Sequence, residues 1–125
     1  MDELFQELID EKITTRSPGF KARLEKADVI NCTGKSLLDS AVLSEIEQIN
    51  VYFALEYKLV YLMKNGTNYE IAHLNYLISN FLFHSLTPLF GRELATKYAE
   101  DACKFDNNDE NAAWLKYVTD EKNIY

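Results

Sequence analysis

Residues 36–64 read SLLDSAVLSEIEQINVYFALEYKLVYLMK and contain neither glycine nor proline. Apolar side chains recur along this stretch at steps of three and four residues, which places them on one side of an α-helix. They are Leu38, Val42, Ile46, Ile49, Phe53, Tyr57, Val60 and Met63. At 1.5 Å per residue the helix would be about 40 Å long, the span of a small domain. We therefore expect the other helices to pack against this buried stripe.

The residues that follow predict a tight turn into a second helix. A basic last turn at Lys64 followed by Gly66 is typical of a helix end. Thr67 with Glu70 three residues later matches a capping box, which indicates that a new helix begins at about Asn68. This second helix, predicted to run to Leu86, is apolar nearly all round, as a central buried helix is. Its apolar residues are Ile71, Leu74, Leu77, Ile78, Phe81, Leu82, Phe83 and Leu86.

Shorter helices are predicted on both sides of this hairpin, over residues 2–13, 18–27, 88–105 and 110–122. Ser17-Pro18 and Thr87-Pro88 each resemble a helix cap followed by proline at the first helical position. We expect three sets of side chains to face inward from the last three of these helices: Phe20, Leu24 and Ala27; Leu89, Phe90, Leu94, Tyr98, Ala102 and Phe105; and Ala113, Trp114, Tyr117 and Val118.

No stretch alternates between apolar and polar residues for long enough to predict a strand. The predicted fold is therefore all-α. Residues 1–125 would form a single-domain helical bundle of five or six helices around a central antiparallel helical hairpin, made by residues 36–64 and 68–86.

Composition excludes several classes of function. The chain has 125 residues, is 47% hydrophobic and carries a formal net charge of −7. This acidity disfavours sequence-independent binding to nucleic acid and adhesion to an anionic membrane surface. The sequence starts MDELFQELIDEK, which is acidic where a signal peptide would be basic, and no apolar run approaches the roughly 20 residues of a membrane span. We expect a cytoplasmic protein in which Cys32 and Cys103 are reduced thiols, with a single disulfide between them as the alternative.

Catalytic and metal-binding residues are not recognisable in the sequence. His73 and His84, the two histidines, would lie about 16 Å apart on one helix, too far to share a metal ion. The acidic residues form no clear catalytic pair, and two histidines leave little material for acid–base chemistry. We therefore predict a protein that is not an enzyme and has no cofactor and no metal.

Four polar residues interrupt the most apolar helix, at Asn75, Ser79, Asn80 and His84. Buried polar groups need hydrogen-bond partners, and Ser40, Ser44 or Asn50 of the long helix would supply them. The same residues would instead line a small polar pocket near the Pro88 helix. This second interpretation supports an alternative function, a small-ligand-binding or sensory helical domain with a pocket near Asn80 and His84.

The function that we favour is a non-enzymatic protein-binding module. The chain contains eight tyrosines, and residues 106–125 carry five acidic residues against two lysines. Aromatic anchors beside acidic side chains are typical of surfaces that occlude a basic partner, as an inhibitor, an immunity or antitoxin-like protein, a phage accessory factor or a chaperone would. A homodimer joined through the long helix is a further alternative. The predicted partner-binding residues are Asp106, Asp109, Glu110, Trp114, Tyr117, Asp120 and Glu121, together with Tyr57 and Tyr61 on the long helix.

Overall fold

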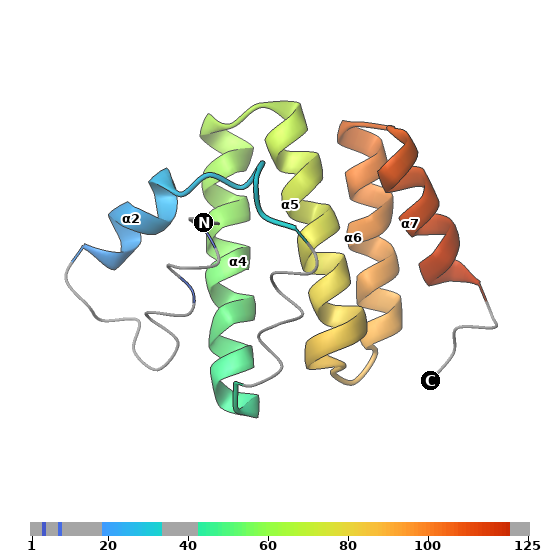
Figure 1. Cartoon of the computed structure of the whole chain (residues 1–125), viewed down its shortest axis with the longest axis horizontal. Helices are drawn as coiled ribbons and strands as arrows, with labels where there is room; N and C mark the ends of the chain where they lie inside the picture. Colours follow the sequence, from blue (N-terminus) through green and yellow to red (C-terminus); the bar gives the residue numbers. More distant parts are fainter. Residues whose placement is uncertain (1–3, 5–7, 9–18, 34–42, 121–125) are drawn as a thin grey trace.

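Helices make up most of the computed structural model, which describes Leu4, Leu8 and residues 19–33 and 43–120. In chain order they are α2 (Phe20–Lys26), α4 (Glu45–Asn65), α5 (Asn68–Asn80), the π-helical segment η2 (Phe81–Leu86), α6 (Gly91–Phe105) and α7 (Asp109–Thr119). Helices α4, α5 and α6 lie side by side, with α2 beside α4 at one end and α7 beside α6 at the other (Figure 1). The described residues contain no strand, and the all-α prediction is confirmed.

Helix α5 is the centre of the bundle. Leu74, Leu77 and Ile78 are completely buried, and the apolar face of η2 continues the core through Phe81 and Leu82. On its two sides α5 packs against α4 and, more extensively, against α6. The prediction that this helix is the buried one is confirmed, although its main packing partner is α6 and not the long helix.

The long helix begins later than predicted. Ser44 is its N-cap, and the Ser44 side chain accepts a hydrogen bond from the backbone of Glu47 while the Glu47 carboxylate accepts one from the backbone of Ser44. The predicted continuous helix over residues 36–64 is therefore wrong, because α4 begins only after Ser44. Ser36 itself lies outside the described residues. Glu47, three residues after the cap, closes the capping box because its side chain reaches back to the Ser44 backbone.

The buried face of α4 is also not the predicted one. Ile46, Phe53, Val60 and Met63 are 70%, 63%, 52% and 54% exposed. The face that packs against the core carries Val51, Ala54, Leu55, Lys58 and Leu62. Helix α4 is apolar on two sides. Lys58 lies in the middle of one of them, and because lysine is rarely buried, the sequence predicted that this side faces solvent.

Lys58 is buried because its ammonium group caps the C-terminal end of α2. Its Nζ donates to the backbone carbonyl oxygens of Glu25 and Ala27, at 2.7 Å each. These carbonyls belong to the last turn and the C-cap of α2, where a positive charge complements the helix dipole. Burial lowers the pKa of Lys58 from its ordinary value. The predicted burial of Phe20, Leu24 and Ala27 in this region is confirmed.

The turn between α4 and α5 has the predicted local structure. Gly66 is the C-cap of α4, and Thr67 and Glu70 form a capping box at the start of α5. Gly66 has an extended backbone, so its role is spatial: a Cβ atom there would lie 2.7 Å from Leu62 Cδ2 and 3.0 Å from the Leu62 carbonyl oxygen. Glycine therefore allows the chain to leave α4 close to its last turn.

The entry to α6 differs from the prediction. Thr87-Pro88 does not begin a helix; Thr87 and Phe90 both adopt left-handed backbone conformations, with φ of 40° and 60°, and α6 starts at Gly91. This path turns Leu89 and Phe90 outward, to 81% and 66% exposed, and Leu94 is 39% exposed. Their predicted inward orientation is wrong, because the helix begins three residues later and the buried face of α6 is Gly91, Ala95, Tyr98, Ala99 and Ala102.

The predicted helix over residues 2–13 and the Ser17-Pro18 cap lie outside the described residues, apart from Leu4 and Leu8, which are both buried. At the other end, α7 stops at Thr119. Val118 is buried as predicted, whereas Ala113 and Tyr117 are exposed. Within residues 19–33 and 43–120, no helix combines the length and apolarity that a membrane crossing requires.

Candidate functional site

Four side chains of α7 line one wall of a surface pocket. Glu110, Ala113, Trp114 and Tyr117 recur at steps of three and four residues, so they share one face of the helix. This face is opposed by Tyr76 of α5 and His84 of η2. Together the six residues enclose about 330 Å³ of space that is open to solvent, which we call the α7 pocket.

Aromatic rings form most of the α7 pocket. The rings of Trp114 and Tyr117 are nearly parallel, with centroids 5.4 Å apart and an interplanar angle of 21°. Tyr76 meets Trp114 edge-on at 6.1 Å, and His84 lies 5.5 Å from Trp114. Phe83, which is buried, packs edge-on against Trp114, with ring centroids 5.7 Å apart and an interplanar angle of 85°. Edge-to-face and offset arrangements of this kind are favourable, so the rings hold one another in place.

Ser79 fixes the position of Trp114. The Trp114 indole Nε1 donates to Ser79 Oγ at 2.7 Å, and Ser79 Oγ donates to the carbonyl oxygen of Ala95 at 2.6 Å. One fully buried hydroxyl thus connects α5, α6 and α7. Because the indole N–H is already used inside the protein, Trp114 presents only its ring to the pocket.

The polar residues of α5 do not pair with the long helix as predicted. Ser79 bonds to α6 and α7, while Asn75 and Asn80 each donate to the carbonyl oxygen one turn back in their own helix, Ile71 and Tyr76. Asn75 is 2% exposed, and its Oδ1 has no partner among the described residues. Of the two residues of the predicted ligand pocket, His84 lines the α7 pocket and Asn80 does not.

Glu110 is the one acidic side chain among the described residues that line the α7 pocket. It lies in the exposed first turn of α7, after the N-cap Asn108, whose side chain accepts from the backbone of Asn111 at 2.8 Å. Burial, and then the charge of Glu110, raise the pKa of Tyr76. Partial burial lowers the pKa of His84, so its imidazole is neutral at pH 7. The pocket is therefore aromatic and negatively charged at one end.

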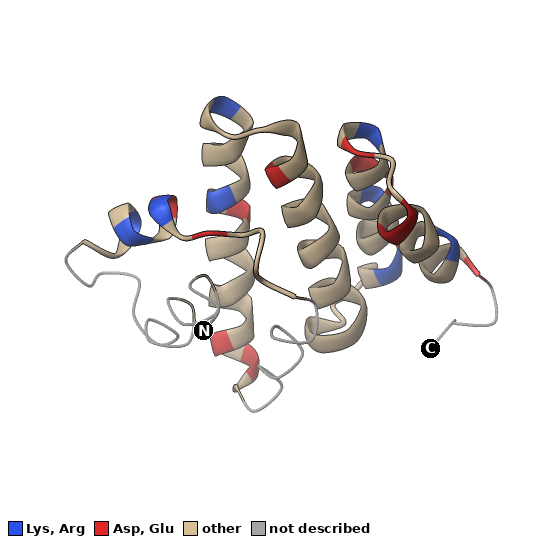
Figure 2. Cartoon of the chain, turned by 45° about the horizontal axis from the view of Figure 1, so that its top comes forward, with Lys and Arg blue, Asp and Glu red and all other residues tan. Residues whose placement is uncertain are grey.

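The other predicted partner-binding residues of this segment surround the pocket or lie outside the described residues. Asp106 shapes the turn before α7, since its carbonyl oxygen accepts from Asn111 Nδ2 at 2.8 Å. Asp109 is exposed beside Glu110, and Asp120 is the C-cap of α7. Glu121 lies outside the described residues. Acidic side chains thus occur at both ends of α7, with the larger group at its N-terminal end (Figure 2).

Tyr57 and Tyr61 lie on α4, which is separated from α7 by α5 and α6 (Figure 1). The Tyr57 hydroxyl donates to Glu25 Oε2 at 2.5 Å, and this hydrogen bond raises the pKa of Tyr57. The ring of Tyr61 lies 5.7 Å from the Nζ of Lys58. Both tyrosines therefore help to hold the region of α2 and do not belong to the surface around α7.

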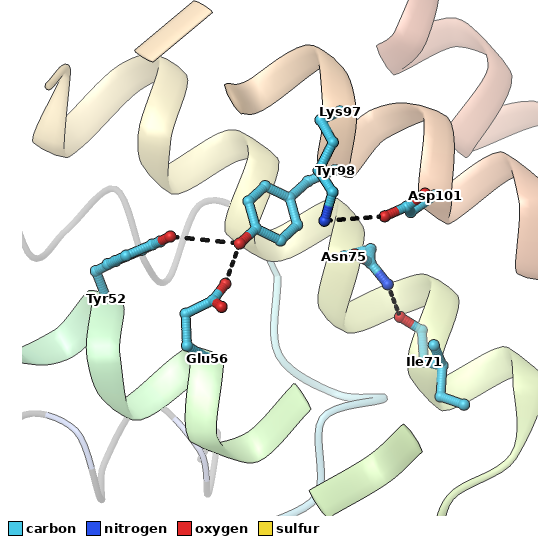
Figure 3. Close-up of polar contacts among 7 residues, drawn as sticks. All are labelled: Tyr52, Glu56, Ile71, Asn75, Lys97, Tyr98 and Asp101. Atoms are coloured by element: carbon cyan, nitrogen blue, oxygen red, sulfur yellow. Dashed lines mark hydrogen bonds and ion pairs between the residues drawn. The ribbon is translucent and has the colours of Figure 1, made fainter. Parts of the chain in front are cut away.

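A second polar cluster connects α4 with α6 (Figure 3). The Tyr98 hydroxyl donates to the carboxylate of Glu56 and lies 3.3 Å from the hydroxyl of Tyr52. Burial, and then the hydrogen bond to Glu56, raise the pKa of Tyr98 well above its usual range. Lys97 lies 4.6 Å from the Tyr98 ring centroid and 3.3 Å from Asp101. A buried tyrosine that keeps its proton and bridges two helices acts as a structural tie.

One histidine meets the backbone of one of the two cysteines in the structure. His73 Nε2 lies 2.7 Å from the carbonyl oxygen of Cys32, which ties the segment after α2 to α5. Cys32 is buried, and burial raises the pKa of the Cys103 thiol, which disfavours its thiolate. Among the described residues, no group of three or more His, Cys, Asp or Glu side chains is arranged to hold a metal ion.

Comparison of the chain with protein-family models, with curated proteins and with solved structures finds no match in any of the three.

Proposed function

We propose that this protein is a non-enzymatic binding module that occludes a basic surface of a protein partner through α7. The observation that carries this proposal is the meeting of Glu110, Trp114 and Tyr117 with Tyr76 and His84 in one pocket. Held aromatic side chains in a concave surface are the usual anchors of protein interfaces. The role would be that of an inhibitor, an immunity or antitoxin-like protein, or a chaperone, acting in the cytoplasm.

Charge supports the choice of a basic partner. The chain carries a formal net charge of −7, and Asp106, Asp109 and Glu110 surround the N-terminal end of α7. A negative surface of this kind raises the rate of encounter with a positive one, and the effect weakens as salt screens it. The aromatic wall would then supply contacts that slow dissociation.

Charge reversal at α7 tests the proposal. After affinity capture of the partner from the native host, the variant Asp109→Lys, Glu110→Lys, Asp120→Lys should associate with that partner at least tenfold more slowly at low salt. The matched control is Glu45→Lys, Glu93→Lys, Glu100→Lys, which makes the same change in net charge on α4 and α6 and should retain most of the rate. Equal association rates for the two triple variants would exclude α7 as the contact surface.

A second candidate, self-association through α4, is favoured by one observation. Ile46, Phe53, Val60 and Met63 are all more than half exposed on one face of this helix. Beside them Phe20, Leu24, Ala54 and Tyr57 help to line an apolar groove of about 230 Å³ between α2 and α4. Contiguous exposed apolar side chains often mark an interface. We propose that two copies pack these faces together.

Sedimentation over a range of protein concentrations tests this second candidate. Phe53→Glu should shift the protein to the monomer, whereas Leu89→Glu, which changes a residue that is 81% exposed elsewhere, should not. A wild-type protein that stays monomeric at high concentration would contradict self-association.

A further inference from the structure

The walls of the α7 pocket differ in chemistry in a way that selects among ligands. The faces of its aromatic rings carry partial negative charge, and Glu110 adds a full negative charge at the N-terminal end of α7. Among the described residues that line the pocket, none supplies a positive charge. An anion would therefore be repelled, and a purely apolar ligand would make no use of the negative charge.

From this arrangement we infer that the α7 pocket accepts a single arginine side chain of the partner, with its guanidinium against Trp114 and Tyr117 and hydrogen-bonded to Glu110. The inference rests on the proposed function, because it names the group that the proposed surface recognises. Arginine fits better than lysine, since its planar guanidinium stacks on aromatic rings and donates two parallel hydrogen bonds to a carboxylate.

The spacing along α7 suits such a ligand. Glu110 precedes Trp114 by one turn, and Tyr117 follows Trp114 by nearly another, so the three side chains cover about 10 Å of one helix face. A cation is attracted within about 6 Å of a ring centroid, and tryptophan attracts it most strongly. The stem of the arginine would lie along the rings while its head reaches the carboxylate.

The surroundings keep Trp114 available for this contact. Its indole N–H is bonded to Ser79 at 2.7 Å, and Phe83 packs edge-on against it at 5.7 Å, so the ring cannot turn away from the pocket without losing both contacts. The volume of about 330 Å³ is at the lower end of the range for small-molecule sites. That size suits one side chain of a larger partner more than a free ligand with many atoms.

The chain contains a single tryptophan, so fluorescence excited at a wavelength that the eight tyrosines do not absorb reports on this pocket. The probe is Nα-acetylarginine amide, and the control probe is Nα-acetylcitrulline amide, which has nearly the same shape without the charge. We expect the arginine probe to change Trp114 fluorescence with millimolar affinity, and the citrulline probe to bind about tenfold more weakly or not at all. Equal binding of the two probes, or no binding of either, overturns the inference.

Two pairs of variants locate the probe within the pocket. Glu110→Gln should weaken the arginine probe about threefold to fivefold, as expected for the loss of an exposed ion pair, whereas Glu100→Gln on α6 should not change it. Tyr117→Leu should weaken it by a similar factor, and Tyr117→Phe should restore it, because the ring and not the hydroxyl makes the contact. An unchanged affinity in both Glu110→Gln and Tyr117→Leu would overturn the inference, and the recovery in Tyr117→Phe separates lost contact from lost folding.

The outcome for the pocket and the outcome for the proposed function are separable. If the charge-reversed α7 variant loses the partner while the arginine and citrulline probes bind alike, α7 is the interface but its pocket does not read arginine. If the arginine probe binds selectively while charge reversal leaves the partner unaffected, the pocket is real and the proposed occlusion through α7 is wrong.

Discussion

His84 is the residue of the α7 pocket whose charge changes near neutral pH. Partial burial against Phe83 and Trp114 lowers its pKa, so the folded protein favours the neutral imidazole. The stability that this contributes is complete above the unfolded pKa of about 6.5, and it decreases as the pH falls below that value, because the unfolded chain then binds the proton more readily.

We expect the midpoint of thermal unfolding to fall by less between pH 7 and pH 5.5 in His84→Gln than in the wild-type protein. Glu110, Tyr76 and Tyr117 line the same pocket as this imidazole. Subtracting the change measured in the variant from the change measured in the wild-type protein removes contributions that do not involve His84. Parallel pH dependence in the two proteins would show that His84 is not stabilised as the neutral form.

At the scale of secondary-structure elements, Ser79 joins three helices through one hydroxyl. Ser79→Ala would leave the Trp114 indole N–H and the Ala95 carbonyl without this partner, and we expect it to lower the free energy of unfolding by about 1–3 kcal/mol. Trp114 fluorescence should also shift to longer wavelength as α7 loosens. Ser85→Ala is the matched control, because the Ser85 hydroxyl is buried with no partner among the described residues. Urea unfolding of both variants measures the difference, and equal losses would contradict the role of Ser79.

Helix boundaries followed from the sequence where a local signal set them. The capping box at Thr67 and Glu70 depends on residues three apart, so it is legible without knowing the fold. The choice of buried face on α4 depends instead on its neighbours. Val51 and Phe53 are both apolar but lie on different sides of α4, and only the side with Val51 is buried. Lys58 is on that buried side, where the carbonyl oxygens of α2 accept its hydrogen bonds. The left-handed backbone conformations at Thr87 and Phe90 could not be predicted, because neither residue is glycine, the residue that usually indicates a positive φ.

The part of the candidate site that lies on α7 could be predicted from the sequence, whereas the part on other elements could not. Glu110, Trp114 and Tyr117 share a helix face, which periodicity reveals. That Tyr76 and His84 complete the pocket depends on how α5 and η2 pack against α7, and no spacing along the chain contains that information. The same applies to Ser79, whose partners are on two other helices.

At the scale of the whole molecule, Tyr98 is the contact that holds α4 to α6 across the centre of the bundle (Figure 3). Tyr98→Phe keeps the ring and its packing but removes the hydrogen bond to Glu56. We expect a loss of about 1–3 kcal/mol in the free energy of unfolding, because hydrogen bonds to charged groups contribute more than neutral ones. Tyr69→Phe changes a tyrosine that is 49% exposed and should have little effect in the same urea titration. If both variants match the wild type, the network of Tyr52, Glu56 and Tyr98 does not stabilise the bundle.

The buried ammonium group of Lys58 allows the detachment of α2 from α4 to be measured by chemical modification. An amine-acylating reagent would modify the exposed lysines Lys21, Lys64 and Lys97 quickly, while Lys58, at 2% exposed, would react only in the moments when α2 detaches from α4. The acylation rate of Lys58 divided by that of an exposed lysine, both followed by peptide mass spectrometry, should therefore equal the fraction of molecules in which α2 is detached from α4. Acylation of Lys58 as fast as that of Lys64 would mean that α2 is not held there in solution.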